Sequence, residues 1–510
     1  MYTTQKRRIL AALLAFVLLT SAGCAGNTTK EPDTGAESGT TATAETVDST
    51  ETDPYADVDF GGQSLRFCSS NDTFDATNAH RLIAGSGELN GEMINDAVYN
   101  RNAYVQELLN IKLDFTPVEW AYNISRDELN KLIMAGEDLY DVLINDMSTF
   151  ATYTPQGYFH SLSGNRNLSM DSSYWYASAM DELEIVPGAR YMMLGDYFTD
   201  CLASAHVLYY NKTVIEDVTG DANKVQELVM NGSWTIDEMT ALVEETAIDL
   251  DGDGAMGKGD RYGYTVMGPY GPLVPVVMGF DLTWIEKHSD GSASLAINNE
   301  RSVTALEKMI SLYWNNGTLQ DVRQYYSGDN LSQLLCQVLA NGESVFVGYL
   351  RLCDLEQMRD VEYTIGLAPY PKLEGTQEQY VSTIHDTTEV GVIPVTMPLS
   401  NMDFVTACLE VLGRETAKTV LPAYYDNGLK VKYVDGSDEA AMIDLIHDTV
   451  ASPFILGYGL NGLMSDMFLV ATSNKQSDFA SQFAKNEAKY QTALDDLITQ
   501  LTESVERANS

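Results

Sequence analysis

The sequence predicts an α/β protein with two lobes joined by a hinge. Short apolar runs of strand length alternate with helical stretches from residue 63 onward, a pattern typical of parallel strands connected by helices. After a polar N-terminal segment, roughly 450 residues of the 510-residue chain remain, too many for a single hydrophobic core. Near the middle, residues 205–242 predict a strand, an irregular polar connection and a helix capped by Thr235.

The N-terminus has the features of a secretion signal. Residues 6–8 are basic, and residues 9–19 form an apolar run too short to span a bilayer. The sequence TSAGC at 20–24 resembles a bacterial lipobox, with serine where leucine is more common. We therefore expect a lipoprotein signal peptide over 1–23 and a lipid on Cys24; a plain signal peptide with an incidental cysteine is the alternative.

Residues 24–57 predict a disordered acidic tether. They are rich in Thr, Ser, Glu, Asp, Ala and Gly and contain almost no large apolar residues, so they cannot bury enough surface to offset the cost of ordering. A lipid at Cys24 would then hold a folded domain at the extracellular face of a bacterial cell membrane. Because no later apolar run reaches transmembrane length, we expect the lipid to be the sole membrane attachment.

The charge of the chain excludes some classes of ligand. The formal net charge is -42, and removal of residues 1–23 leaves 28 basic against 73 acidic side chains, or -45. Nucleic acid is not an expected partner, because phosphate contacts need clustered Lys and Arg. Five cysteines follow Cys24, without metal-site spacing and among apolar neighbours; we expect buried thiols and leave a single disulfide open.

The first lobe is expected to begin with alternating strands and helices. Strands are predicted at 63–70, 111–115 and 140–144, and helices at 95–109 and 126–135. Ligands of open α/β sheets bind beyond the carboxyl ends of the strands. Polar or aromatic side chains follow each of the three predicted strands: Asn71 and Asp72, then Trp120, then Asp146.

The second half of the chain continues with mixed elements. We expect a strand at 261–266, a strand, tight turn and strand within 280–297, and helices at 302–314, 403–412 and 479–505. The last of these helices is long and amphipathic.

Residues 249–260 form the most specific chemical motif. Acidic oxygens at loop positions 1, 3, 5 and 12 and a glycine at position 6 match a calcium loop of the EF-hand type. The predicted ligands are Asp249, Asp251, Asp253, the carbonyl of Ala255, and Asp260. Asp260 replaces the usual glutamate, which makes bidentate coordination less assured. We expect one structural Ca²⁺ remote from the ligand; an acidic turn without metal is the alternative.

Two short sequences carry a resemblance to a known family. LYYNK at 208–212 and the Trp-Thr pair at 234–235 resemble the extracellular solute-binding proteins of ABC importers, in the carbohydrate-binding group that includes maltose-binding protein. The resemblance implies a type II periplasmic-binding-protein fold, with an interlobe cleft and a hinge at 209–211. It implies lobe 1 at 58–208 plus about 361–410, lobe 2 at 209–360, and a C-terminal helical region at 411–510 packing across both.

The same resemblance implies part of the ligand site. Asp146 matches a sugar-binding aspartate, Tyr270 matches an aromatic residue that stacks on sugar, and Tyr349 matches an aromatic after a strand that ends in glycine. Arg351 can fork hydrogen bonds to hydroxyls or a carboxylate. Further candidates, each with a core side chain as its alternative, are Asn71, Asp72, Trp120, Trp175, Tyr197, Trp284 and Tyr458.

We therefore predict a monomeric, lipid-anchored binding protein that captures a sugar or oligosaccharide for an ABC permease. No catalytic motif is legible, so we expect no enzyme. A surface glycosidase is the main alternative, because a pair of catalytic carboxylates can be hidden among 73 acidic residues. A lipoprotein that senses a ligand for a membrane kinase is the third hypothesis.

Overall fold

The protein is described by a computed structural model. The described residues are 53–71, 78–119, 122–328, 330–358, 361–385, 387–430, 436–451 and 454–509. The predicted signal peptide, Cys24 and most of the predicted tether lie outside them. Residues Pro54–Ser510 form one compact unit. Within the described residues, no helix has both the length and the apolar run needed to cross a membrane.

The first sheet has four strands in the order β12-β3-β1-β2. Strand β1 (Gln63–Ser70) pairs in parallel with β2 (Ile111–Val118) and β3 (Val142–Asp146), and β12 (Glu389–Val392) pairs antiparallel with β3. All five residues of β3 are buried because it lies between two strands, whereas edge strand β2 is largely exposed. The predicted parallel core of this sheet is confirmed.

The second sheet has five strands in the order β10-β4-β9-β5-β8. These are β10 (Ile365–Ala368), β4 (Leu208–Asn211), β9 (Ser344–Val347), β5 (Tyr262–Thr265) and β8 (Thr318–Leu319). Strand β4 is antiparallel to both of its neighbours, while β5 is parallel to β8 and β9. Residues 365–368, which the prediction placed in lobe 1 as part of the range 361–410, instead form β10, because their backbone pairs with the crossing strand β4.

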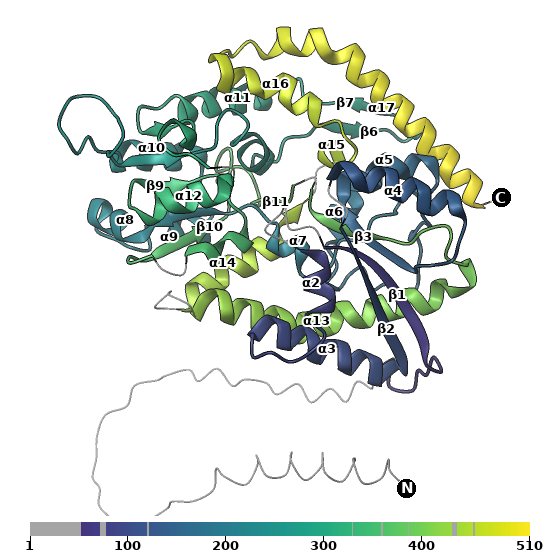
Figure 1. Cartoon of the computed structure of the whole chain (residues 1–510). Coiled ribbons are helices and arrows are strands. Elements are labelled where there is room, and N and C mark those ends of the chain that lie inside the picture. The colour runs from purple at the N-terminus through teal and green to yellow at the C-terminus, as the bar shows by residue number, and fades with distance from the viewer. Residues whose placement is uncertain are drawn as a thin grey trace, which may run out of the picture. The chain divides into compact units, whose positions relative to one another are not determined.

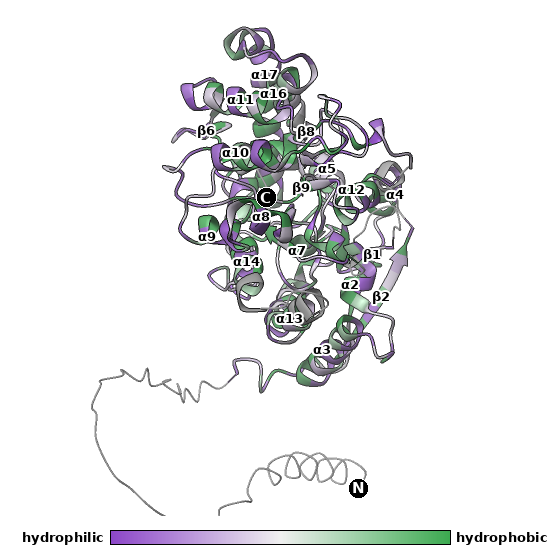
Figure 2. Cartoon of the chain, turned by 90° about the vertical axis from the view of Figure 1, so that its left-hand side faces the viewer, coloured by the Kyte–Doolittle hydropathy of each residue, from purple (hydrophilic) through white to green (hydrophobic). Residues whose placement is uncertain are grey.

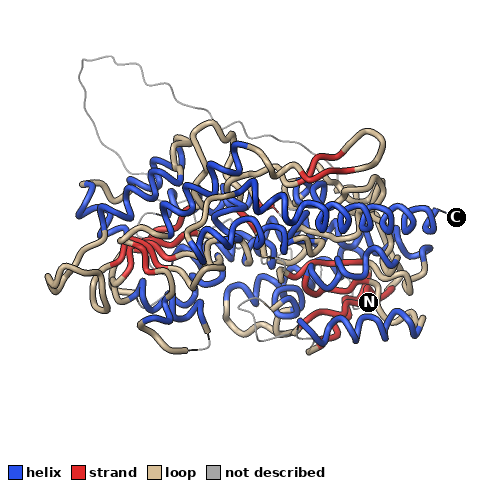
Figure 3. The backbone as a smooth tube through the Cα atoms, turned by 90° about the horizontal axis from the view of Figure 1, so that it is seen from above, coloured by secondary structure: helices blue, strands red, loops and turns tan. Residues whose placement is uncertain are grey.

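The chain passes between the sheets on either side of β4 and β10. It leaves the first sheet before β4 and returns between β10 and β12, so each sheet is built from segments far apart in sequence. Figure 3 shows the strands in separate groups surrounded by helices. The predicted two-lobed α/β fold is confirmed.

Helices cover the sheets where apolar periodicity predicted them. Helix α3 (Met93–Leu109) follows β1 along the chain, and α4 (Tyr122–Ala135) precedes β3. Helix α10 (Ile236–Thr246) is capped by Thr235, whose side chain accepts the N–H of Glu238. Figure 2 shows hydrophobic and hydrophilic residues on both α10 and α11 (Glu300–Tyr313), as expected for helices with one buried face.

The remaining elements connect or flank the sheets. They are α2 (Ala79–Ala84), α5 (Met147–Tyr153), η1 (Thr154–Gln156), α6 (Ala177–Leu183), α7 (Asp200–Ala203), α8 (Lys212–Thr219), α9 (Lys224–Met230), the π-helical turn η2 (Leu273–Val277), β6 (Ile285–Lys287), β7 (Ala293–Leu295), η3 (Val322–Gln324), α12 (Leu331–Ala340), η4 (Leu352–Met358), β11 (Ser382–Thr383), η5 (Leu399–Asn401), α14 (Gly436–Asp448), β13 (Val450–Ala451) and α15 (Phe454–Gly457).

The C-terminal region is helical. Helix α13 (Met402–Lys430) packs along α3, and α16 (Asn461–Asn474) precedes the long α17 (Phe479–Asn509), which is yellow in Figure 1. In α17, Gln491 Nε2 donates to the carbonyl of Ala293 at 2.9 Å, and Ser504 Oγ lies 3.2 Å from the hydroxyl of Tyr191. The helix therefore contacts elements assigned to both predicted lobes.

The cysteines after Cys24 are thiols. Cys68, Cys201, Cys336, Cys353 and Cys408 are not paired in disulfides, and all but the half-buried Cys353 are buried. The disulfide that the sequence left open is not formed among them.

A buried ion pair fastens α14 to the segment before α7. His447 Nε2 lies 3.0 Å from Oδ2 of Asp196, whose Oδ1 accepts the hydroxyl of Tyr176 at 2.8 Å. Burial alone lowers the pKa of His447, but the hydrogen bond and charge of Asp196, helped by Asp448, outweigh it and raise the pKa to about 8.

This pKa predicts that stability declines in mildly alkaline solution. Since the folded pKa lies above the unfolded value of about 6.5, the full contribution is present below that pH and is lost as pH rises through about 8. The loss should be about 2 kcal/mol of unfolding free energy, measured by urea unfolding from pH 6 to about 9. His447→Gln should remove this dependence and His288→Gln, on the exposed hairpin, should retain it; a wild-type dependence in His447→Gln contradicts the assignment.

Candidate functional site

Acidic and polar residues gather at one edge of the first sheet. Strands β1 and β3 are parallel and end at this edge, and the antiparallel β12 begins there, so that Glu389 is the register partner of Asp146. Asn71 follows β1 directly, and its Oδ1 accepts Nδ2 of Asn78 at 3.0 Å. Asn71 and Asp146 were predicted at this edge from the sequence, but Glu389 was not, because it is the first residue of a strand and is far from the others in sequence.

Asp146 is a helix cap at this edge. Its carboxylate accepts the N–H of Thr149 at 2.8 Å and the hydroxyls of Ser148 and Thr149, both at 2.7 Å. Burial raises the pKa of Asp146, while these hydrogen bonds act in the opposite direction. Asp146 is therefore the N-cap of α5. A ligand that bonds to Asp146 must share a carboxylate that already accepts these three hydrogen bonds.

Glu389 is held in a similar way. Its Oε2 accepts the N–H of Ala79 at the start of α2, and its own N–H donates to Oδ2 of Asp200 at 2.8 Å. Both Glu389 and Asp200 are buried. Through these hydrogen bonds the two carboxylates hold α2 and α7 at the end of the first sheet.

Aromatic side chains mark the corresponding edge of the second sheet. Strands β9 and β10 run in the same direction, and Tyr349 and Tyr370 follow them; the N–H of Tyr349 donates to the hydroxyl of Tyr370 at 2.7 Å. Tyr349 has φ of 72°, in the left-handed region that non-glycine residues rarely adopt. Such strain persists where the surroundings enforce it, and it is common at ligand sites.

Gly348 lets β9 end in this way. A Cβ atom at this position would lie 2.2 Å from the hydroxyl oxygen of Tyr264, a fully buried ring on the neighbouring β5. The predicted pattern of a strand followed by a glycine and an aromatic residue is thus present. Glycine is required at position 348 because the ring of Tyr264 leaves no room for a side chain there.

Three rings meet where the chain crosses between the sheets. The ring centroid of His206 lies 5.2 Å from that of Tyr349 and 6.1 Å from that of His385, and the Tyr349 hydroxyl lies 3.4 Å from Nε2 of His385. His206 lies two residues before β4 on the outward crossing, and His385 lies on the return between β11 and β12. We call these three residues the crossing cluster.

His206 stays neutral within the crossing cluster. Its side chain is 1% exposed, and burial, followed by the charges of His385 and Arg351, lowers its pKa well below the ordinary value. The backbones of His206 and Arg351 form an isolated antiparallel β-bridge, and the backbone N–H of Arg351 donates to the carboxylate of Asp354 at 2.9 Å. No sequence pattern pointed to the cluster beyond the place of His206 just before the crossing strand.

Tyr270 is available to a ligand. It follows β5 and precedes η2, and its side chain is 58% exposed although the residue is aromatic. Tyr458 is half-buried and packs against Phe454, with ring centroids 4.9 Å apart, and burial raises its pKa. Asp72 and Trp120 lie outside the described residues.

Three predicted ligand contacts are core residues instead. Trp175 is buried and donates Nε1 to Glu410 at 2.8 Å, Tyr197 is buried and donates its hydroxyl to the carbonyl of Met193, and Trp284 packs edge-on against Phe468. Their aromatic faces are covered by protein and cannot stack on a sugar. The prediction is wrong for these three, because sequence alone does not separate a core aromatic from an exposed one.

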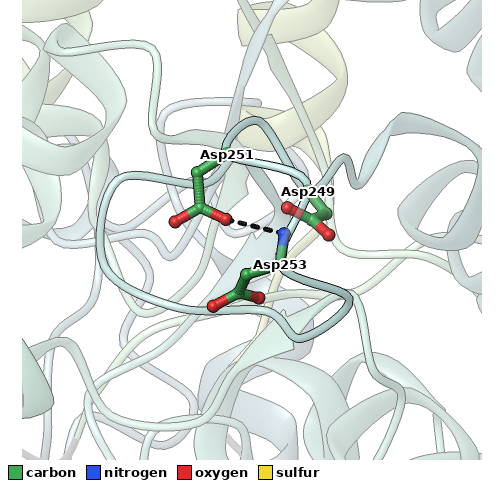
Figure 4. A group of neighbouring side chains, drawn as sticks. All are labelled: Asp249, Asp251 and Asp253. Carbon is green, nitrogen blue, oxygen red and sulfur yellow. Dashed lines mark hydrogen bonds between the residues drawn. The ribbon is translucent and has the colours of Figure 1, made fainter.

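The acidic loop brings three of its predicted ligands together. Carboxylate oxygens of Asp249, Asp251 and Asp253 lie within 4.8 Å of one another (Figure 4). Gly254 has φ of 89°, as the sharp turn at position 6 requires, and its N–H donates to Asp249 at 2.8 Å. Hydrogen bonds from Gly254 and Gly252 lower the pKa of Asp249.

Asp260 has a different environment from these three. It is buried, and its carboxylate accepts the N–H of Leu250 at 2.8 Å and of Gly257 at 2.7 Å. Its carboxylate is not part of the group of gathered oxygens. The donor set of three carboxylates suits a hard cation such as Ca²⁺, with Asp260 closing the loop beneath it.

Comparison with known proteins identifies the fold. No family model matches the sequence. No curated protein matches it either. Among solved structures, a cyclo/maltodextrin-binding protein complexed with maltotetraose matches with a TM-score of 0.53 and 12% identity, over 87% of this chain and 97% of that one. UspC of M. tuberculosis matches with 0.52 and 13%, over 84% and 100%. The predicted resemblance to the maltodextrin-binding type of solute-binding protein is thus confirmed at the level of the fold.

Replacing Gly348 tests the architecture of this edge. Gly348→Ala should lower the free energy of unfolding by about 1–3 kcal/mol, because the added methyl group overlaps the buried Tyr264 ring. Gly375→Ala is the matched control, since no atom outside the adjoining residues lies within 4 Å of a Cβ built there. Equal stability of the two variants in urea unfolding would contradict the packing described.

Proposed function

We propose that the protein is a lipid-anchored, extracellular and monomeric solute-binding protein. It captures a sugar or oligosaccharide between its lobes and delivers it to an ABC permease. The crossing cluster is the observation that carries the proposal, because it brings one residue from each chain crossing, His206 and His385, against Tyr349 at the end of β9. The fold it shares with a maltodextrin-binding protein supports the choice of ligand class.

The binding step requires no covalent chemistry. Tyr349 and the exposed Tyr270 present flat faces for the C–H side of a sugar ring, and Arg351 and His385 supply polar atoms for hydroxyls. His206, kept neutral by burial, adds no charge to repel or attract an ionic ligand. Contacts from both lobes favour the closed state, which a permease can recognise.

The experiment that tests this proposal measures binding of maltose, maltotriose and maltotetraose by calorimetry. Tyr349→Ala and Tyr270→Ala should each weaken the affinity about tenfold or more, since each removes a stacking face. Tyr104→Ala, which removes a tyrosine 46% exposed on α3, is the matched control and should bind as the wild type does. Absence of binding contradicts the ligand class, and cleavage of the glycan would establish the glycosidase hypothesis instead.

We also propose that the acidic loop holds one structural Ca²⁺ through Asp249, Asp251, Asp253 and the carbonyl of Ala255. The gathered carboxylates of Figure 4 support this assignment, because they place three oxygen donors of the kind that Ca²⁺ prefers within reach of one ion. The ion would stiffen the connection between α10 and β5, away from the crossing cluster.

Calcium should raise the unfolding temperature of the protein. At a concentration one hundred times the dissociation constant, the gain is about 2.7 kcal/mol, lost again on chelation. Asp251→Asn should reduce the gain, and Asp217→Asn, an exposed aspartate on α8, should not. An unfolding temperature that is the same with calcium and with chelator would remove the calcium proposal without affecting sugar binding.

A further inference from the structure

A cavity separate from the crossing cluster lies beside the acidic loop. Its volume is about 550 Å³, within the range of small-molecule sites. The residues that line it come from the acidic loop, the start of β5, and the segment from the end of α11 to just beyond η3; they include Tyr262, Trp314, Asn315, Asn316, Gln324 and Tyr325. All of them belong to the part of the chain around the second sheet.

The lining of this cavity differs in chemistry from the rest of the chain. Charged residues make up 20% of the sequence, yet none of the residues lining the cavity is Asp, Glu, Lys or Arg. Three are aromatic and four carry amides. Charged groups lie behind the lining, since Lys475 Nζ is 5.9 Å from the centroid of the Trp314 ring and Glu244 accepts Asn315 Nδ2. The lining side chains themselves are uncharged, and their rings and planar amides suit a ligand rich in hydroxyl groups.

The walls of the cavity are fixed by hydrogen bonds. Trp314 donates Nε1 to the carbonyl of Ala471 at 2.7 Å, and Asn315 donates Nδ2 to Glu244 at 2.8 Å while its Oδ1 accepts the N–H of Gly317. The hydroxyls of Tyr262 and Tyr325 lie 3.2 Å apart. Preformed walls of this kind lower the entropy cost of binding.

Two amides remain to contact a ligand. Asn316 and Gln324 are exposed, and within the described part of the chain neither side chain has a hydrogen-bond partner. Each offers one acceptor and two donor hydrogens in a plane, which matches neighbouring hydroxyls on a sugar ring. The cavity thus combines fixed aromatic walls with uncommitted amides at its mouth.

We propose that this cavity is a second saccharide site, for a neutral mono- or disaccharide, that works independently of lobe closure. Its lining comes from one sheet and its connections, so movement between the lobes does not assemble or dismantle it. Because Gly254, Ala255 and Met256 form one wall, the state of the acidic loop affects the shape of this site.

Fluorine NMR of the full folded domain labelled with 5-fluorotryptophan tests the proposal. The chain has five tryptophans, and Trp314→Phe identifies the resonance of Trp314. Glucose, galactose, mannose, maltose, cellobiose and lactose are titrated at constant calcium. At least one of these sugars should shift the Trp314 resonance in a saturable manner, and the shift should persist in Tyr349→Ala.

A variant of the exposed amide Gln324 tests whether the cavity itself binds the sugar. Gln324→Ala should weaken this binding about tenfold, whereas Gln333→Ala, an exposed glutamine on α12, should leave it unchanged. The proposal is overturned if none of the six sugars shifts the Trp314 resonance, if Tyr349→Ala abolishes the shift, or if Gln324→Ala has no effect. Failure here leaves the crossing cluster untouched, because that site is measured by its own variants.

Discussion

The antiparallel pairing of β4 with β9 and of β12 with β3 is the constraint on which the candidate site depends. Strands that run against their neighbours begin where those neighbours end. The crossing segments must therefore arrive at the edges where β3 and β9 end, and they carry His206, His385 and Glu389 to those edges. A parallel arrangement would have placed the same residues at the far edges.

Glycine–tyrosine contacts hold the strands in this arrangement. A Cβ atom would lie 2.2 Å from Tyr264 at Gly348, 2.2 Å from the ring of Tyr210 at Gly366, and 2.3 Å from the hydroxyl of Tyr197 at Gly391. In each case a buried tyrosine ring occupies the space that a side chain would need. This explains why Tyr197 is a core residue: its ring covers the middle of β12 and is not free to reach a ligand.

Hydrogen bonds from buried polar side chains link α3 and α13 to each other and to neighbouring segments of the first lobe. Arg101 is 1% exposed, and its guanidinium donates to the carbonyls of Ile83 and Tyr197 and to Thr416 Oγ1 at 2.6, 3.1 and 2.9 Å. A buried charge costs free energy unless its donors are satisfied, and here carbonyl and hydroxyl oxygens satisfy several of them. On α13, the buried carboxylate of Glu410 accepts hydrogen bonds from Trp175 Nε1 and from the hydroxyl of Tyr174. These contacts link segments of the first lobe that lie far apart in the sequence.

The sequence by itself determined the elements and their class. Apolar periodicity and capping located β1, α10 and α17, because these signals act over a few residues, and the glycine–aspartate spacing of the acidic loop is equally local. Only the tertiary structure decided that β10 belongs to the second sheet, that Trp175, Tyr197 and Trp284 are core residues, and that His206 meets Tyr349 and His385. Burial and long-range pairing join residues far apart in the chain, and no local pattern records which distant side chain will cover an aromatic face.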